Sequence, residues 1–139
     1  MNAAEMDDTV MYINEEWLDY VLSIKDTYDP MFLMAHEARH IYQKQVIDDY
    51  KQRGRSCELP NIVQGWINNI SCYIRNEGGD SQAVNASQSI EIDANAFACV
   101  YLLYKKNLMP RISPSCEKEV LKRMKEIGHK LWKITISEQ

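Results

Sequence analysis

The chain has 139 residues, the length of one domain, and its 45% apolar and 26% charged residues are typical of soluble globular proteins. Five Gly and four Pro are too few for a disordered or linker-rich chain. Sixteen basic residues against 20 acidic ones give a formal net charge of −4. Direct nucleic-acid binding is therefore not expected, because neutralising phosphates requires a clustered basic excess. We expect a single domain over residues 1–139.

The sequence also predicts where the protein resides. The first ten residues are acidic and lack the basic and then apolar layout of a secretory signal. The longest apolar run, residues 96–104, has about half the length that a membrane-spanning helix needs. Four scattered cysteines without a CxxC pair give no support to a cysteine-based zinc site. These features predict a cytoplasmic protein with reduced thiols and no membrane partner.

The N-terminal part is expected to hold a short strand followed by helices. β-Branched and aromatic residues favour a strand over 9–14, and apolar residues at helical spacing favour a helix over 15–26. Asp29 followed by Pro30 is typical of a helix start, so the next helix is predicted over 30–52. Its predicted buried stripe comprises Met31, Met34, Ala35, Ala38, Ile41, Tyr42 and Val46.

The remaining elements are predicted to be helices and loops. Residues 61–74 are moderately helical, 75–85 read as a surface loop with two glycines, and helices are predicted over 85–108 and 116–133. The predicted buried faces of the last two helices comprise Ile90, Ala94, Phe97, Ala98, Tyr101 and Leu102, and then Val120, Met124, Ile127 and Leu131. The basic residues of the final helix alternate with acids and are predicted to form a solvated outer face. The expected fold class is mainly α with a small N-terminal β element (α+β).

The most specific feature is the sequence HEARH at residues 36–40, an HExxH pattern inside a predicted helix. Residues four apart lie on the same face of a helix, so His36 and His40 can bind one metal ion. Glu37 is rotated by about 100° from His36 and can act as the general base toward the attacking water. Arg39 puts a charge between the histidines, where stricter versions of the motif have an uncharged residue. The alternative is a surface helix with two solvated histidines.

Zinc bound by two histidines needs a third protein ligand. The remaining histidine, His129, lies in the last predicted helix. Glu91 and Asp93 are two positions apart in a predicted helix, so they point about 200° away from each other and cannot both face one site. Glu91 shares its face with Asn95, whose amide can hold the far nitrogen of a ligating histidine, whereas Asp93 has no such polar companion. We therefore predict Glu91 as the ligand; the alternative is a carboxylate that only matches the helix dipole.

Residues 91–98 read EIDANAFA and are followed by Leu102-Leu103 and Met109-Pro110. Together with the HExxH segment, they resemble the ImmA/IrrE family of small zinc metallopeptidases. That family is similar in pairing an HExxH helix with a second helix of the form ExEAN-x-FA-x-x-LL, often ending in Met-Pro. A wider resemblance is to gluzincins, whose third ligand is a glutamate with an Asp or Asn four residues later.

The resemblance implies a minimal zincin-like or gluzincin-like metallopeptidase domain. It implies that His36, His40 and Glu91 bind Zn²⁺ and that Glu37 is the general base. It also implies that the Asn95 amide hydrogen-bonds the far nitrogen of a ligating histidine. It also implies a protein or peptide substrate. Family members with known roles cut helix-turn-helix repressors, so a transcriptional repressor is one candidate.

The predicted function is therefore a zinc-dependent metalloendopeptidase that hydrolyses a peptide bond by metal-activated water. The alternative is a non-catalytic protein-binding module on a zincin-like fold with structural or vestigial zinc, and a third possibility is a metal-free regulatory helical protein. A residue that stabilises the oxyanion is also expected. Its candidates, which the sequence does not rank, are Tyr12, Tyr42, Tyr73 and His129.

Overall fold

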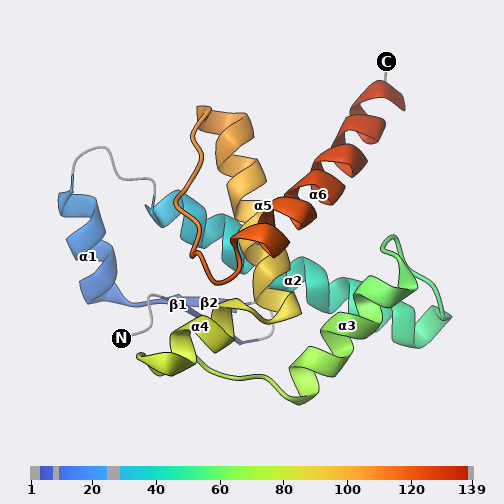
Figure 1. Cartoon of the computed structure of the whole chain (residues 1–139), viewed down its shortest axis with the longest axis horizontal. Coiled ribbons are helices and arrows are strands. Elements are labelled where there is room, and N and C mark those ends of the chain that lie inside the picture. The colour runs from blue at the N-terminus through green and yellow to red at the C-terminus, as the bar shows by residue number, and fades with distance from the viewer. Residues whose placement is uncertain (1–3, 8–9, 25–28, 138–139) are drawn as a thin grey trace.

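The computed structural model describes residues 4–7, 10–24 and 29–137 (Figure 1). Its elements are β1 (Ala4–Asp7), β2 (Val10–Ile13), α1 (Glu15–Ser23), α2 (Asp29–Arg53), α3 (Pro60–Ser71), α4 (Asp80–Ala86), α5 (Ser89–Lys106) and α6 (Glu117–Ser137). The prediction of a mainly α fold with a small N-terminal β element is confirmed. Thr9, Lys25 and Asp26, which the predicted strand and first helix include, lie outside the described residues.

The two strands form an antiparallel pair that leads directly into α1. Ala4 lies opposite Ile13 at one end of the pair. The predicted strand is β2, whereas β1 was not predicted. Asn14 then starts α1, because its side-chain oxygen accepts a hydrogen bond of 2.9 Å from the backbone N–H of Trp17, which would otherwise lack a partner.

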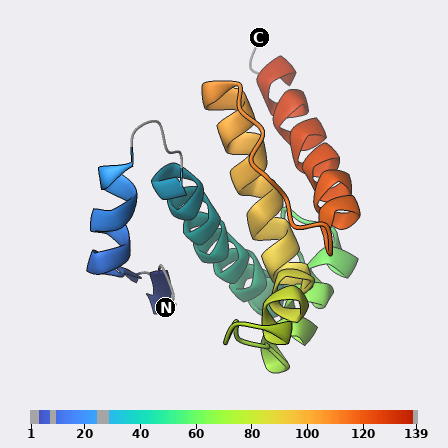
Figure 2. The same ribbon diagram turned by 60° about the vertical axis from the view of Figure 1, so that its left-hand side comes forward.

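The three long helices lie side by side, with α5 between α2 and α6 (Figure 2). The shorter α3 packs against α2 and α5. A first core cluster joins α2, α3 and α5 and comprises Val46, Ile47, Val63, Trp66 and Ile90. A second core cluster joins α5 to α6 and to the residue before it, and comprises Ala96, Cys116, Val120 and Ile127. No helix in the described ranges has both the length and the apolar character of a membrane span.

The buried face of α2 differs from the predicted apolar stripe. Met34 is 50% exposed and Ala38 is exposed as well, so this part of the prediction was wrong. The helix instead buries Glu37, Arg39 and Gln43. Polar side chains can be buried only when they find partners, and α5 and α6 supply those partners, as described below. The predicted stripe is buried at Ala35 and Val46, so the prediction failed at Met34 and Ala38 and missed the buried polar residues.

The segment predicted as a loop over residues 75–85 contains most of α4. Gly78 and Gly79 have φ angles of 85° and 57°, a backbone conformation that favours glycine, and they turn the chain into this helix. The prediction missed α4 because this short helix buries none of its residues and so shows no apolar stripe. In α6 the predicted face is buried at Val120 and Ile127, but Leu131 is 46% exposed.

Candidate metal centre

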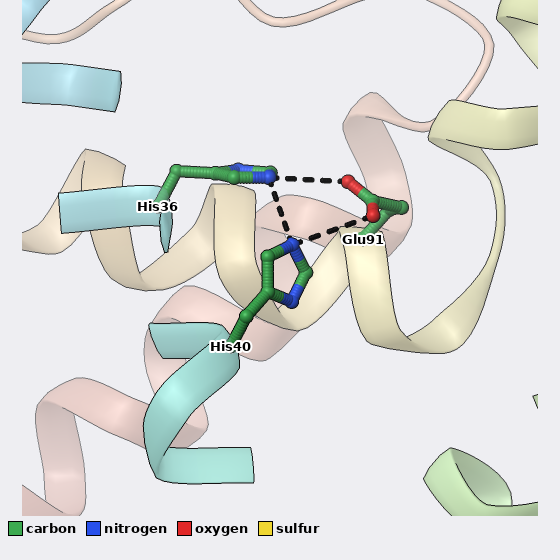
Figure 3. A group of neighbouring side chains, drawn as sticks. All are labelled: His36, His40 and Glu91. Carbon is green, nitrogen blue, oxygen red and sulfur yellow. Dashed lines mark hydrogen bonds and ion pairs between the residues drawn. The ribbon is translucent and has the colours of Figure 1, made fainter. Parts of the chain in front are cut away.

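Three side chains predicted to bind zinc converge in the structure (Figure 3). His36 and His40 project from consecutive turns of α2, and Glu91 projects toward them from the first turn of α5. The two Nε2 atoms lie 3.0 Å apart, and the Glu91 oxygens lie 3.2 Å from Nε2 of His36 and 3.4 Å from Nε2 of His40. Within the described ranges, this is the one group of three or more potential ligands close enough to share an ion.

The donor set and its spacing fit a zinc ion. Ligand atoms about 2.0–2.1 Å from a tetrahedral zinc ion are about 3.3 Å apart, close to the separations found here. Two imidazole nitrogens and one carboxylate are also a ligand set of catalytic zinc sites, which leave a fourth position for water. The three side chains could therefore hold zinc without rearrangement of the helices.

The far nitrogen of each imidazole contacts a side-chain amide oxygen. Nδ1 of His36 lies 2.8 Å from Oδ1 of Asn95, and Nδ1 of His40 lies 2.8 Å from Oε1 of Gln43. An amide oxygen only accepts, so each Nδ1 carries the proton in this arrangement and each Nε2 faces the shared point. The contact that the sequence predicted for Asn95 is present, whereas the contact of Gln43 was not predicted.

The position of Glu91 is fixed by α3 and by the segment after it. Oδ1 of Asn69 on α3 accepts from the backbone N–H of Ile90 at 3.1 Å, which caps the first turn of α5. The hydroxyl of Tyr73 donates to Oε1 of Glu91 at 2.8 Å, and Nδ2 of Asn85 donates to that hydroxyl at 3.1 Å. Burial and the charge of Glu91 raise the pKa of Tyr73 to about 12, so the hydroxyl keeps its proton.

The ionisable groups of the site perturb one another. Burial by itself raises the pKa of Glu91, but hydrogen bonds and charges from the two histidines outweigh it and hold that pKa well below the usual range. Burial lowers the pKa of His40, but the hydrogen bonds to Glu91 and Gln43 outweigh it and the net pKa is raised. Glu37 is only 8% exposed, and its burial raises its carboxyl pKa despite the neighbouring histidines.

The four candidates for stabilising an oxyanion lie in different places. Tyr73 contacts Glu91 and so borders the three predicted ligands. Tyr42 instead donates to Glu58 at 2.6 Å, and His129 lines a pocket whose lining residues do not include the ligands. Tyr12 lies on β2 and is 57% exposed. Among the described residues, Tyr73 is therefore the candidate of the four that hydrogen-bonds a predicted ligand.

Arg39 of the HExxH segment and Asp93 of the EIDAN segment pair with each other. Nε and Nη2 of Arg39 donate to the carboxylate of Asp93 at 2.8 and 3.1 Å, and both side chains are buried. The prediction considered only companions on the same face of α5, whereas the partners of Asp93 come from α2 and α6. Asp93 does not belong to the group that could share an ion, as its helical offset from Glu91 predicts.

A buried charge cluster extends from this pair into α6. Nε of Arg123 donates to Oδ1 of Asp93 at 2.7 Å, and its Nη2 lies 3.4 Å from Oε2 of Glu58. Nζ of Lys130 lies 3.0 Å from Oε1 of Glu58. We call Arg39, Arg123, Asp93 and Glu58 the charge cluster; its two cations and two anions balance. The prediction that the basic residues of α6 face solvent is therefore wrong for Arg123, whose side chain is 12% exposed.

Sequence reasoning missed Gln43 and the charge cluster. The spacing of Gln43 could have indicated its contact with His40. Gln43 follows His40 by three positions, so it lies on the same face of α2, one turn further on. The pairing of Arg39 with Asp93 had no such local signal, because the two lie 54 positions apart and hydrophobic periodicity does not report long-range ion pairs.

Comparison with family models, curated proteins and solved structures finds no match to this chain. The function is therefore argued from the geometry of the site.

Proposed function

We propose that the protein is a zinc-dependent metalloendopeptidase that hydrolyses a peptide bond in a protein or peptide substrate. One observation carries the proposal: two imidazole nitrogens and a carboxylate from separate helices lie 3.0–3.4 Å apart. Their far sides are held by amide oxygens, which leaves the inward-facing nitrogens free to bind a cation. A solvated histidine pair would not require Glu91 to approach from another helix.

The proposed chemistry follows from the residues at the site. Zinc held by His36, His40 and Glu91 would lower the pKa of a bound water and polarise the scissile carbonyl. Glu37 adjoins the ligand pair on α2, and its carboxylate would accept the proton of the attacking water and return it to the leaving amine. Tyr73 would donate a hydrogen bond to Glu91 or to the substrate oxyanion.

The resemblance of both motifs to the ImmA/IrrE family supports the same proposal and extends it to the substrate. On that resemblance, the fold would be zincin-like, and a transcriptional repressor of the helix-turn-helix kind is one candidate substrate. Both statements rest on the motif residues of α2 and α5.

The test combines metal analysis with proteolysis. We expect about one zinc per chain after metal stripping and reloading, and chelator-sensitive cleavage of a peptide library. Glu37→Gln should retain zinc but lose cleavage by about 10²–10⁴-fold, the usual contribution of a general base. Glu16→Gln, an exposed carboxyl group on α1, is the matched control and should cleave normally.

Two outcomes would contradict the proposal and favour a different function. Zinc that binds tightly without any cleavage would favour the non-catalytic binding module. A protein that binds no zinc would leave a metal-free cluster, in which a protonated His40 pairs with Glu91.

A further inference from the structure

The amide of Gln43 is held in one orientation by buried acceptors. Its side chain is fully buried, and its Nε2 donates to the backbone carbonyl of Ile90 at 2.9 Å and to Oδ2 of Asp93 at 2.8 Å. A backbone carbonyl and an ionised carboxylate can only accept, so both amide hydrogens are committed to them. The atom facing Nδ1 of His40 must therefore be the carbonyl oxygen Oε1.

This orientation determines the tautomer of His40. Since Oε1 of Gln43 has no proton to give, Nδ1 of His40 must carry one to make the 2.8 Å contact. In the neutral ring, Nε2 then presents its lone pair, and it is this atom that lies closest to His36 and Glu91. The opposite tautomer would place two lone pairs against each other at Gln43 and would turn a proton toward the metal position.

Asp93 can hold Gln43 in place because the charge cluster holds Asp93. Arg39 approaches from α2 with two donors, and Arg123 approaches from α6 with one. Asp93 is 1% exposed, so these bonds do not compete with solvent. A continuous series of hydrogen bonds therefore connects Arg123, through Asp93 and Gln43, to Nδ1 of His40.

We propose that Gln43 is a positioning residue that sets the tautomer and ring orientation of His40, and that Asp93, held by Arg39 and Arg123, locks the Gln43 amide. Metal affinity at the site then depends on Arg123 of α6, a residue that contacts no ligand. This inference rests on the proposed function only in taking His40 as a metal ligand.

The first experiment measures zinc affinity by competition with a chromophoric chelator, and the cobalt absorption spectrum reports ligand geometry. Gln43→Met removes the amide at nearly constant volume and should weaken zinc binding about 10–100-fold, the usual cost of losing a group that orients a ligand. Arg123→Met should weaken it in the same direction by a smaller factor. The matched controls are Gln45→Met and Lys122→Met, which change exposed residues of the same two helices and should leave affinity within twofold.

The second experiment reads the tautomer directly, without any variant. Because the chain has three histidines, a ¹⁵N-edited spectrum of the metal-free protein resolves each imidazole, with exposed His129 as an internal reference. At a pH where the rings are neutral, His40 should be protonated at Nδ1, and Gln43→Met should shift it to a tautomer mixture. The shift is measured in a variant that stays folded, so a loss of folding cannot account for it.

The outcomes separate this inference from the proposed function. A wild-type His40 protonated at Nε2, or a folded Gln43→Met protein with unchanged zinc affinity, would refute the role of Gln43. Unchanged affinity in Arg123→Met alone would refute the link to α6. If wild type binds neither zinc nor cobalt, the proposed function fails, while the tautomer measurement still decides the role of Gln43.

Discussion

Replacing Asp93 by Asn is the sharpest stability test of the charge cluster. The Asp93 side chain is 1% exposed and accepts two hydrogen bonds from Arg39, one from Arg123 and one from Gln43. Asn has nearly the same shape, but it removes the negative charge and, in either orientation of its amide, turns donor hydrogens toward the guanidinium group of Arg39. Removing one partner of a buried ion pair costs about 3–5 kcal/mol, because the remaining charges stay buried without compensation.

The size of this loss can be judged against an exposed ion pair of the same helix. Arg53 and Asp49 on α2 lie 3.6 Å apart, with side chains 65% and 52% exposed. Water already solvates both groups, so Asp49→Asn should cost only about 0.3–0.5 kcal/mol. The substitution is chemically the same at both positions, so the ratio of about tenfold in free energy reflects the burial of Asp93 and its larger number of charged partners.

Urea unfolding followed by circular dichroism measures both variants. With a slope of about 2 kcal/mol per molar, Asp93→Asn should lower the urea midpoint by about 2 M at an unchanged slope. A double-mutant cycle with Arg39→Met should give a coupling free energy of at least about 1 kcal/mol, since the two groups are in contact. The reasoning is refuted if Asp93→Asn costs no more than Asp49→Asn, because the pair would then be effectively solvated.

Three further predictions use the same measurements. Trp66→Ala should cost about 3–5 kcal/mol in urea unfolding, because Trp66 is 2% exposed in the first core cluster; a loss below about 1 kcal/mol would contradict that packing. Burial raises the pKa of Glu58, but hydrogen bonds from Tyr42 and Lys130 and the charges of Arg123 and Lys130 outweigh it, so the net pKa is lowered. Its stabilisation should be complete above the ordinary pKa of 4.5 and lost as pH falls through the lowered value, and Glu58→Gln should flatten this part of the pH–stability curve. Zinc at 100 times its dissociation constant should stabilise wild type by about 2.7 kcal/mol and leave His36→Ala unchanged, whereas equal shifts in both would place zinc elsewhere.

The elements that carry the candidate site could be predicted from local sequence. Helical spacing and the Asp29-Pro30 start located α2 to within a residue at each end, and the rotation of 100° per residue separated Glu91 from Asp93. These features depend only on the geometry of one helix. For the same reason, the contact predicted for Asn95 could be found, since it needs only the face that Asn95 shares with Glu91.

What could not be predicted depends on how the helices pack. The buried face of α2 is polar at Arg39 and Gln43, so a search for an apolar stripe selected exposed Met34 instead. The charge of Arg39, which is unusual within the HExxH motif, is balanced by Asp93 from α5. Alternating charges made Arg123 resemble a surface residue, although it reaches inward between α5 and the segment before α3.

The site joins two helices that the first core cluster already holds together. Val46 and Ile47 of α2 pack with Ile90, the neighbour of Glu91 on α5, so a cation that enters meets ligands in their final places. Metal binding at the proposed site would need little ordering of the chain, unlike in small domains that fold only around their ion. If the proposed function is right, removing the metal should abolish hydrolysis and leave the helices folded, and zinc binding should be reversible.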